Sequence, residues 1–127
     1  MQLILGGARS GKSRLAEQIA QQLAQPVIYV ATAQALDGEM QARIQHHQQQ
    51  RPEDWGLCEE PIYLAAKLVK LDRPNQTILV DCLTLWMSNL LMHTDPDLQV
   101  QECQKLLDVV GNLQSELILV SNETGLG

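Results

Sequence analysis

Four short, continuously apolar runs alternate along the chain with longer segments in which apolar residues recur at helical spacing. Continuous runs are typical of strands buried on both faces of a parallel sheet, because such strands have no side facing solvent. The pattern predicts strands over residues 3–5, 27–31, 78–81 and 117–120. Strands separated by helices indicate an α/β fold with a mainly parallel central sheet and helices on both of its faces.

The segments between the strands predict helices. We expect them over residues 13–24, from Asp37 to about residue 49, from Pro61 to Leu71, around residues 84–91, and from Asp95-Pro96 to Leu113. In the last helix the apolar stripe predicts five inward side chains, which are Cys103, Leu106, Leu107, Val110 and Leu113. The helix around Trp86 is apolar on all sides, so we expect it either to be buried or to form a subunit contact.

A complete G-x-x-x-x-G-K-[ST] phosphate-binding loop lies between the first strand and the first helix, as this motif requires. It consists of Gly6, Gly7, Ala8, Arg9, Ser10, Gly11, Lys12 and Ser13. Glycines let the backbone curl so that successive N–H groups face phosphate oxygens. Lys12 supplies a positive charge for the β- and γ-phosphates, and the Ser13 hydroxyl is suited to Mg²⁺. Arg9 is suited equally to a phosphate contact and to a salt bridge on the loop surface. The motif predicts nucleoside triphosphate binding and a three-layer, P-loop NTPase-like fold of the RecA-like type.

Ligands of open α/β sheets bind beyond the C-terminal ends of the strands. That rule brings together the phosphate-binding loop, the loop at residues 32–34, Asp81 and the loop at Asn122-Glu123. Asp81 closes an apolar strand, so we expect it to hold Mg²⁺, directly or through water, opposite Ser13. The alternative is that Asp81 caps the helix that begins near Thr84.

Length and composition indicate one domain over residues 1–127 with an aliphatic core, since the chain has no Phe. The net charge of −6 argues against nucleic acid as the main partner. The three cysteines form no C-x-x-C pair, which favours reduced thiols. The chain shows no signal-peptide pattern, and its longest nearly apolar run, from Leu83 to Met92, is too short to span a bilayer. These features predict a cytoplasmic protein without a membrane span.

Two adjacent histidines, His46 and His47, lie in a glutamine-rich segment and are by themselves compatible with a solvated helix surface. Arg43 and Arg51 lie four residues on either side of His47, about one helical turn each way. Cations there are suited to hold a polyphosphate while an imidazole reaches phosphorus. Because imidazole is largely neutral at pH 7 and nucleophilic, it is also suited to carry a nucleotidyl group transiently.

The sequence closely resembles a known family over its whole length. Beyond the phosphate-binding loop, the motifs that carry the resemblance are Tyr29-Val30-Ala31-Thr32-Ala33, Asp37-x-Glu39-Met40, Arg43-Ile44-x-x-His47, Arg51-Pro52-x-x-Trp55 and Val120-Ser121-Asn122-Glu123-x-Gly125. In this order they are similar to the bifunctional adenosylcobinamide kinase / adenosylcobinamide-phosphate guanylyltransferases of cobalamin biosynthesis. The family pattern continues beyond Gly127, so the chain is expected to correspond to roughly the N-terminal two-thirds of the family domain.

The resemblance implies two reactions. The enzyme would phosphorylate adenosylcobinamide with ATP or GTP and would then transfer GMP from GTP to adenosylcobinamide phosphate through a guanylyl-histidine. That histidine falls on His47, with His46 as the second choice. The implied nucleotide contacts are the whole phosphate-binding loop, Ala31, Thr32, Ala33, Gln48, Gln49, Gln50, Arg51, Glu59 and Asp81. Many members of the family have Glu where this chain has Asp81, which leaves the role of the acid intact.

The resemblance also implies a homotrimer, which would give the apolar helix around Trp86 a partner. Two other functions remain open from the residues alone. One is a P-loop small-molecule kinase without nucleotidyl transfer, and the other is a nucleotide-binding regulatory module without chemistry of its own. Trp55 is expected to pack its loop against the fold rather than to stack on a ligand.

Overall fold

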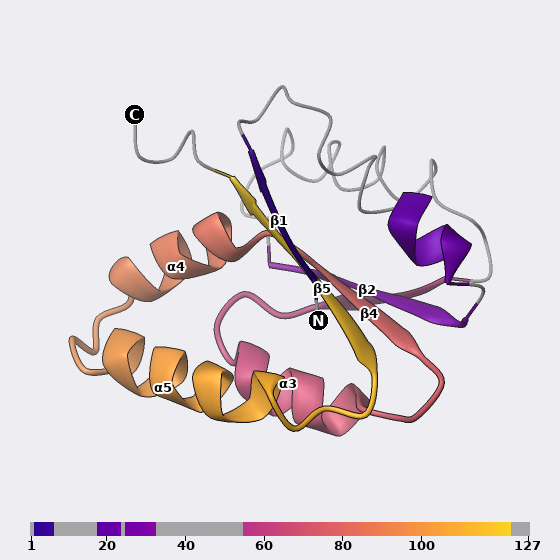
Figure 1. Ribbon diagram of the computed structural model, residues 1–127. Coiled ribbons are helices and arrows are strands. Elements are labelled where there is room, and N and C mark those ends of the chain that lie inside the picture. The colour runs from indigo at the N-terminus through magenta and orange to yellow at the C-terminus, as the bar shows by residue number, and fades with distance from the viewer. Residues whose placement is uncertain (1, 7–17, 24, 33–54, 123–127) are drawn as a thin grey trace.

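The computed structural model describes residues 2–6, 18–23, 25–32 and 55–122 of the chain (Figure 1). Its named elements are the strands β1 (Gln2–Gly6), β2 (Val27–Ala31), β3 (Gly56–Glu59), β4 (Thr77–Asp81) and β5 (Glu116–Asn122), and the helices α3 (Leu64–Leu71), α4 (Leu83–Leu91) and α5 (Leu98–Val110). Residues 18–22 are helical as well.

The strands form one five-stranded sheet in the order β1-β5-β4-β2-β3, and every neighbouring pair is parallel. The α/β class with a parallel central sheet, predicted from the alternation of apolar runs and helical segments, is therefore confirmed. All four predicted strands are present, each within two residues of its expected bounds.

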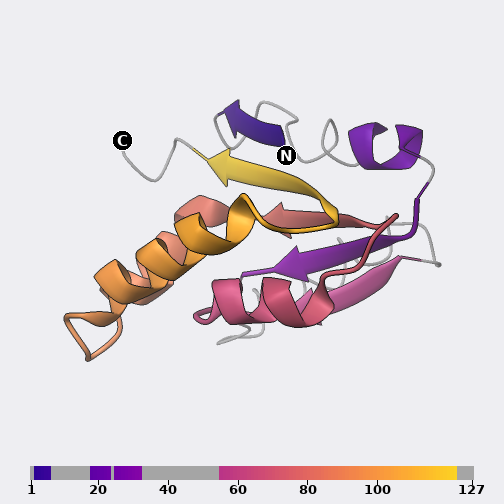
Figure 2. The same cartoon turned by 60° about the horizontal axis from the view of Figure 1, so that its bottom comes forward.

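Helices cover both faces of the sheet, so that the fold has three layers (Figures 1 and 2). Alternate strand residues point to opposite faces. On β4, Ile78 and Val80 contribute to the cluster that α3, α4 and α5 cover, whereas Leu79 contributes to the cluster that contains Ala20 from the helix at residues 18–22. Trp55 packs against this second cluster, as the sequence favoured. Among the described residues, the buried apolar side chains are aliphatic apart from Tyr29 and Trp86.

β3 was not predicted from the sequence. It pairs with β2 alone, at the edge of the described sheet, and only Cys58 of its four residues is partly buried. An edge strand of this kind needs no continuous apolar run, because the sheet needs it only for backbone pairing. A search of the sequence for continuous apolar runs therefore does not find β3.

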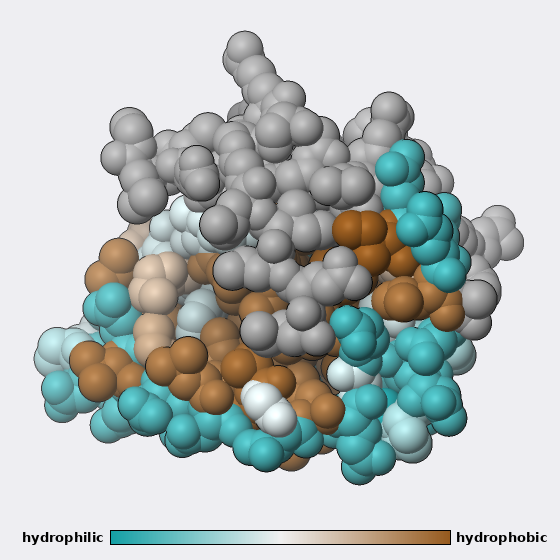
Figure 3. Space-filling model, viewed as in Figure 1, coloured by the Kyte–Doolittle hydropathy of each residue, from teal (hydrophilic) through white to brown (hydrophobic). Residues whose placement is uncertain are grey.

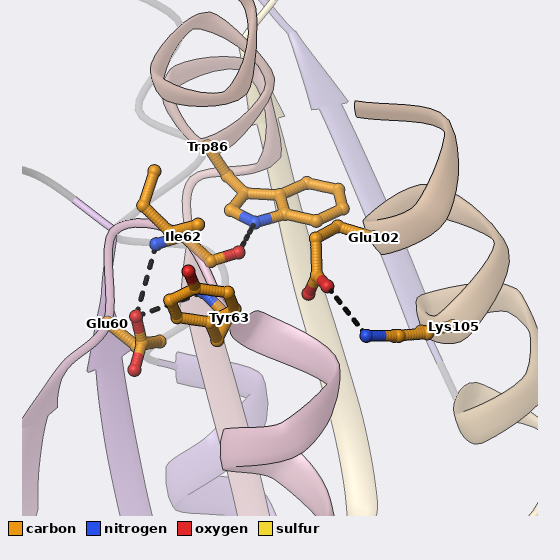
Figure 4. A network of polar contacts seen from close by, with 6 residues as sticks. All are labelled: Glu60, Ile62, Tyr63, Trp86, Glu102 and Lys105. Carbon is orange, nitrogen blue, oxygen red and sulfur yellow. Dashed lines mark hydrogen bonds and ion pairs between the residues drawn. The ribbon is translucent and has the colours of Figure 1, made fainter. Parts of the chain in front are cut away.

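Two helices begin later than predicted. α3 begins at Leu64 rather than at Pro61, because the Glu60 carboxylate accepts hydrogen bonds from the N–H groups of Ile62 (3.1 Å) and Tyr63 (3.0 Å) and holds a turn there (Figure 4). α5 begins at Leu98, with Asp97 rather than Asp95 at its N-cap position. The Asp95 carboxylate accepts the Asp97 N–H at 3.0 Å, in a turn that precedes the helix.

The predicted inward face of α5 is partly wrong. Its buried residues are Leu98, Glu102 and Leu106, while Leu107 is 68% exposed. Residues at this spacing of four lie along one side of a helix, and Leu107 is turned away from that side. The buried Glu102 carboxylate accepts a hydrogen bond from the Lys105 ammonium at 3.1 Å, which compensates its charge at the surface of the core (Figure 4).

The apolar helix around Trp86 is α4, and most of its apolar character is explained by burial. Trp86 is 2% exposed and donates its indole N–H to the Ile62 carbonyl at 2.8 Å (Figure 4). Leu90 is also buried, whereas Leu91 and the following Met92 are exposed. In the space-filling view, apolar residues reach the surface over α4 and α5 (Figure 3). The helix is therefore a core element with an exposed apolar end.

None of the three cysteines, which all lie in the described residues, forms a disulfide. Burial raises the pKa of the Cys103 thiol, and the neighbouring Glu102 carboxylate raises it further. A raised pKa keeps the thiol protonated and unreactive at neutral pH. Cys103 accordingly serves as a packing residue beside the core.

Asp72 links the end of α3 to the segment that enters β5. Its carboxylate accepts hydrogen bonds from the backbone N–H groups of Gln114 (2.9 and 3.0 Å) and Ser115 (2.8 Å). Burial alone would raise the pKa of Asp72, but these hydrogen bonds outweigh it and lower the pKa below its ordinary value of 3.8. The ionised carboxylate thus fixes the start of a central strand.

Replacing Asp72 by alanine is expected to lower the free energy of unfolding at pH 7 by about 1 kcal/mol, since the carboxylate is partly exposed to solvent. A lowered folded-state pKa stabilises the fold above the unfolded-state value, and this stabilisation is lost as the pH falls through the folded-state pKa. Urea unfolding at a series of pH values should therefore show the difference from wild type shrinking below about pH 4. Asp108→Ala, on the exposed side of α5, is the matched control. A difference that is independent of pH would contradict this account.

Candidate functional site

The C-terminal ends of the strands bring several predicted site residues into one row. In the register of the sheet, Ala31 at the end of β2 is paired with Glu59 of β3 on one side and with Asp81 of β4 on the other. Asp81 is paired in turn with Val120 of β5. Three of the residues predicted to contact nucleotide therefore lie side by side across adjacent strands.

β1 ends at the same edge. Ile4 is paired with Val120, and Gly6, the first residue of the phosphate-binding loop, is paired with Asn122. Neighbouring strands lie about 4.8 Å apart, and β5 lies between β1 and β4, so the backbone of Asp81 lies about 10 Å across the sheet from β1. A nucleotide phosphate chain with its metal ion fits a separation of this size.

The Asp81 carboxylate is half-buried and is held by a tyrosine of the neighbouring strand. The Tyr29 hydroxyl donates a hydrogen bond to Asp81 Oδ2 at 2.5 Å. The alternative role of Asp81 as a helix cap is wrong, because Cys82 is the N-cap of α4 and its Sγ accepts the Leu85 N–H at 3.4 Å. The peptide bond between Asp81 and Cys82 is cis.

Thr32 joins the ends of β2 and β4. It is 0% exposed, and its hydroxyl both donates to the Cys82 carbonyl at 2.7 Å and accepts the Cys82 N–H at 3.0 Å. Its own N–H donates to the Asp81 carbonyl at 3.2 Å. The Thr32 side chain is thus engaged with the backbone that follows Asp81, and it fixes that backbone in place.

Asn89 of α4 connects two of the loops at this edge. Its side-chain amide donates to the Thr32 carbonyl at 2.8 Å and to the Pro61 carbonyl at 3.1 Å. Thr32 follows β2 and Pro61 follows β3, so one amide group fixes the segments that leave two neighbouring strands. These two bonds explain why a largely apolar helix carries an amide at this position.

The isosteric substitution Asn89→Asp is expected to lower the free energy of unfolding at pH 7 by about 2–3 kcal/mol. It replaces a donor by a charged oxygen that faces two carbonyl oxygens, which repel it. Urea unfolding measures the loss. Asn112→Asp, where the exposed amide donates to the Asp108 carbonyl at 2.8 Å, is the matched control and should cost less. Equal unfolding midpoints for the two variants would contradict the connecting role of Asn89.

The remaining predicted site residues lie outside the described residues. They are Gly7, Ala8, Arg9, Ser10, Gly11, Lys12, Ser13, Ala33, His46, His47, Gln48, Gln49, Gln50 and Arg51. Their contacts with nucleotide, and the catalytic role of His47, stay predictions. The same holds for Asn122-Glu123, of which Asn122 ends β5.

The described residues fit a magnesium ion of the kind that accompanies nucleotides. Mg²⁺ usually binds one or two carboxylates and completes its coordination with phosphate oxygens and water. Asp81 supplies one oriented carboxylate at the correct edge of the sheet. Within the part of the chain that the structure describes, no group of three or more His, Cys, Asp or Glu side chains forms a metal cluster, which such a site does not need.

Residues 2–127 match the family model described as cobinamide kinase / cobinamide phosphate guanyltransferase. The chain is 54% identical over 125 residues to the bifunctional adenosylcobalamin biosynthesis protein CobP of Pseudomonas aeruginosa. The aligned region covers 98% of this chain and 72% of that protein. It is 41% identical over 141 residues to the bifunctional adenosylcobalamin biosynthesis protein CobU of Escherichia coli, with 100% of this chain and 77% of that protein covered. The corresponding protein of Salmonella typhimurium is 38% identical over 140 residues, with the same coverage.

The parallel sheet, its helical layers and the motif that follows β1 define the class of P-loop nucleotide-binding proteins. Within this class, the chain belongs to the cobinamide kinase / cobinamide phosphate guanyltransferase family. The family expected from the sequence motifs is thereby confirmed. Cobinamide and nucleotide substrates fit this family. None of the helices in the described segments is long and apolar enough to cross a membrane.

Sequence reasoning missed Tyr29 and Asn89 as parts of the site. A signal was present in both cases, because Tyr29 places a hydroxyl in a strand that is otherwise aliphatic and Asn89 places an amide in a largely apolar helix. A buried phenol or amide needs a hydrogen-bond partner. Strand parity also places Tyr29 and Ala31 on one face, and Ala31 pairs with Asp81. The partner itself became evident only once the strand order was known.

Proposed function

We propose that this chain phosphorylates adenosylcobinamide with ATP or GTP and then transfers GMP from GTP to adenosylcobinamide phosphate, which gives adenosylcobinamide-GDP. The observation that carries the proposal is the shared edge of the sheet, where β1 leads into the phosphate-binding loop and the register aligns Glu59, Ala31 and Asp81. Family membership supplies the two reactions. Residues 1–127 would form one P-loop nucleotide-binding domain.

In the proposed kinase step, the loop N–H groups and Lys12 hold the β- and γ-phosphates. Ser13 and Asp81 would hold Mg²⁺, which would neutralise charge on the phosphate oxygens. The aminopropanol hydroxyl of adenosylcobinamide attacks the γ-phosphorus and loses its proton, while the bond from that phosphorus to the β-phosphate oxygen breaks. The products are adenosylcobinamide phosphate and a nucleoside diphosphate.

In the proposed transfer step, an imidazole nitrogen of His47 attacks the α-phosphorus of GTP. The bond from that phosphorus to the bridging oxygen breaks, and pyrophosphate leaves with the electron pair. His46 is the second choice for this nucleophile. A phosphate oxygen of adenosylcobinamide phosphate then attacks the same phosphorus and breaks the P–N bond. This step regenerates the free histidine and forms the diphosphate bond of the product. Arg43 lies four residues before His47, which is about one turn in the predicted helix, and is suited to hold the polyphosphate during the transfer.

The proposal also includes nucleotide contacts at Ala33, at Gln48 to Arg51 and at Glu59, and assembly into a homotrimer. The trimer rests on the family resemblance, and the exposed apolar end of α4, with Leu91 and Met92, is compatible with a subunit contact. The cytoplasmic location expected from cysteine usage rests on the sequence alone.

Two labelled triphosphates test the function directly. With adenosylcobinamide present, label from γ-labelled ATP or GTP should appear in adenosylcobinamide phosphate, and label from α-labelled GTP should appear in adenosylcobinamide-GDP as pyrophosphate accumulates. Transfer of the γ-phosphate alone would favour the small-molecule kinase. Binding of nucleotide without transfer of either label would favour the regulatory module. Both of these results would contradict the proposal.

A further inference from the structure

We propose that Tyr29 is a positioning residue for the metal-binding carboxylate, which its phenolic O–H holds in the orientation that Mg²⁺ requires. The inference rests on the proposed function, since it takes Asp81 as the acid that holds the metal ion. It adds a residue from a neighbouring strand that neither the phosphate-binding motif nor strand-end position identifies.

The geometry of the pair is fixed by two adjacent strands. Ala31 is paired with Asp81, and Tyr29 lies two residues earlier on β2, so both Tyr29 and Asp81 point to the same face of the sheet. That face carries the helix at residues 18–22, whose Ala20 lies in the same apolar cluster as Tyr29. The carboxylate therefore lies on the same side of the sheet as this helix, at the end of the sheet where β1 leads into the phosphate-binding loop.

The hydrogen bond joins a rigid donor to a half-buried acceptor. Tyr29 is 5% exposed, and its ring packs in the cluster with Leu79 and Ile118. A packed aromatic ring has few accessible rotamers, so its hydroxyl is fixed in space. The hydroxyl lies 2.5 Å from Asp81 Oδ2. A short aspartate side chain that accepts such a bond is restrained in both of its torsion angles.

The hydroxyl has no packing role that would explain it. The other residues of β2 are Val27, Ile28, Val30 and Ala31, all aliphatic, and burying a hydroxyl among such residues is unfavourable unless it is bonded. A phenylalanine would fill the same volume without that requirement. The hydroxyl adds a hydrogen bond to Asp81, which a phenylalanine could not make.

A carboxylate that is already oriented binds a metal ion with a smaller loss of side-chain entropy. Groups that hydrogen-bond to metal ligands typically change metal affinity by about 10–100-fold when they are removed. The effect should appear in the affinity for Mg²⁺, because Tyr29 acts on the ligand of the metal. The intrinsic affinity for nucleotide and the rate at saturating Mg²⁺ should change little.

The test uses Tyr29→Phe in the full chain, with a non-hydrolysable GTP analogue. Calorimetry of analogue binding in EDTA and at a series of Mg²⁺ concentrations separates nucleotide affinity from metal affinity, and Mn²⁺ binding followed by electron paramagnetic resonance reports the metal directly. We expect analogue affinity in EDTA within about twofold of wild type and Mg²⁺ and Mn²⁺ affinities lowered by about tenfold. In turnover, KM for Mg²⁺ should rise by a similar factor at nearly constant kcat.

Two further variants distinguish a failure of the Tyr29 inference from a failure of the proposed metal-binding role of Asp81. Tyr63→Phe makes the same chemical change at the other tyrosine of the chain, which is 50% exposed, and should leave all these values unchanged. Asp81→Asn should remove the metal-dependent gain in analogue affinity. If Asp81→Asn retains that gain, the proposed role of Asp81 fails. If Asp81→Asn loses it while Tyr29→Phe binds both metals like wild type, the inference about Tyr29 alone is overturned. Weaker analogue binding by Tyr29→Phe in EDTA to the same extent as in Mg²⁺ would also overturn it, since that result indicates a general structural defect.

Discussion

Replacing His47 by alanine is expected to abolish guanylyl transfer while the kinase step continues. Without the imidazole, no protein nucleophile is available at the α-phosphorus, so the covalent route is lost and transfer of α-label to adenosylcobinamide phosphate falls by about 10³-fold or more. The phosphate-binding loop does not use His47, so phosphorylation of adenosylcobinamide should stay within about threefold of wild type. Separate assays with α- and γ-labelled GTP measure the two steps.

The other two histidines of the chain serve as controls for this prediction. His93→Ala alters an exposed residue between α4 and α5, whose Nδ1 accepts the Asp95 N–H at 3.1 Å, and should leave both steps unchanged. His46→Ala should lower transfer only modestly. Loss of transfer in His46→Ala with retention in His47→Ala would move the nucleophile to His46. Full transfer in both variants would contradict a histidine intermediate altogether.

Replacing Lys12 by alanine should have the second largest effect, and it should act on both steps. The lysine ammonium stabilises the charge that develops on the β- and γ-phosphates, and removal of one such contact costs about 10²–10³-fold in kcat. Because the substitution removes a charged side chain and no buried apolar group, the unfolding midpoint should stay close to that of wild type. Steady-state kinetics with each labelled triphosphate and a urea unfolding curve test both statements.

Lys70→Ala is the matched control for Lys12, since Lys70 lies on the exposed side of α3 in its last turn. It makes the same change in side chain and net charge away from the sheet edge. If Lys70→Ala slows the reactions as much as Lys12→Ala, the loss of activity in Lys12→Ala results from the change in net charge and not from a lost phosphate contact. If Lys12→Ala retains wild-type kcat in both steps, the loop does not hold the phosphates as proposed.

The parts of the fold that could be predicted from the sequence are those dictated by burial on two faces. Strand segments such as Val27–Ala31 and residues 78–80 of β4 are continuously apolar because helices cover both sides of the sheet. Their alternation with helices implied parallel pairing and placed Asp81 and the phosphate-binding loop at one edge. The strand order β1-β5-β4-β2-β3 was not predicted, since pairing depends on which faces meet in space.

The features that the sequence did not predict depend on polar contacts between distant segments. β3 lies at an exposed edge and shows no buried pattern, and the start of α3 is set by the Glu60 carboxylate rather than by Pro61. The capping role of Cys82 depends on its position after β4. Tyr29 and Asp81 are 52 residues apart in the sequence and meet only because β2 and β4 are neighbours. Local patterns carry no information on such pairs.

The central claim is that a histidine of this chain accepts GMP from a GTP molecule bound by the loop after β1. The most direct measurement is the intact mass of the protein after incubation with GTP and Mg²⁺ in the absence of adenosylcobinamide. The account predicts that the mass rises by one guanylyl group, that one pyrophosphate is released for each group added, and that mild acid reverses the gain, because a P–N bond is acid-labile. An unchanged mass in a preparation that phosphorylates adenosylcobinamide and also forms adenosylcobinamide-GDP would contradict it, since GMP would then pass directly from GTP to the acceptor.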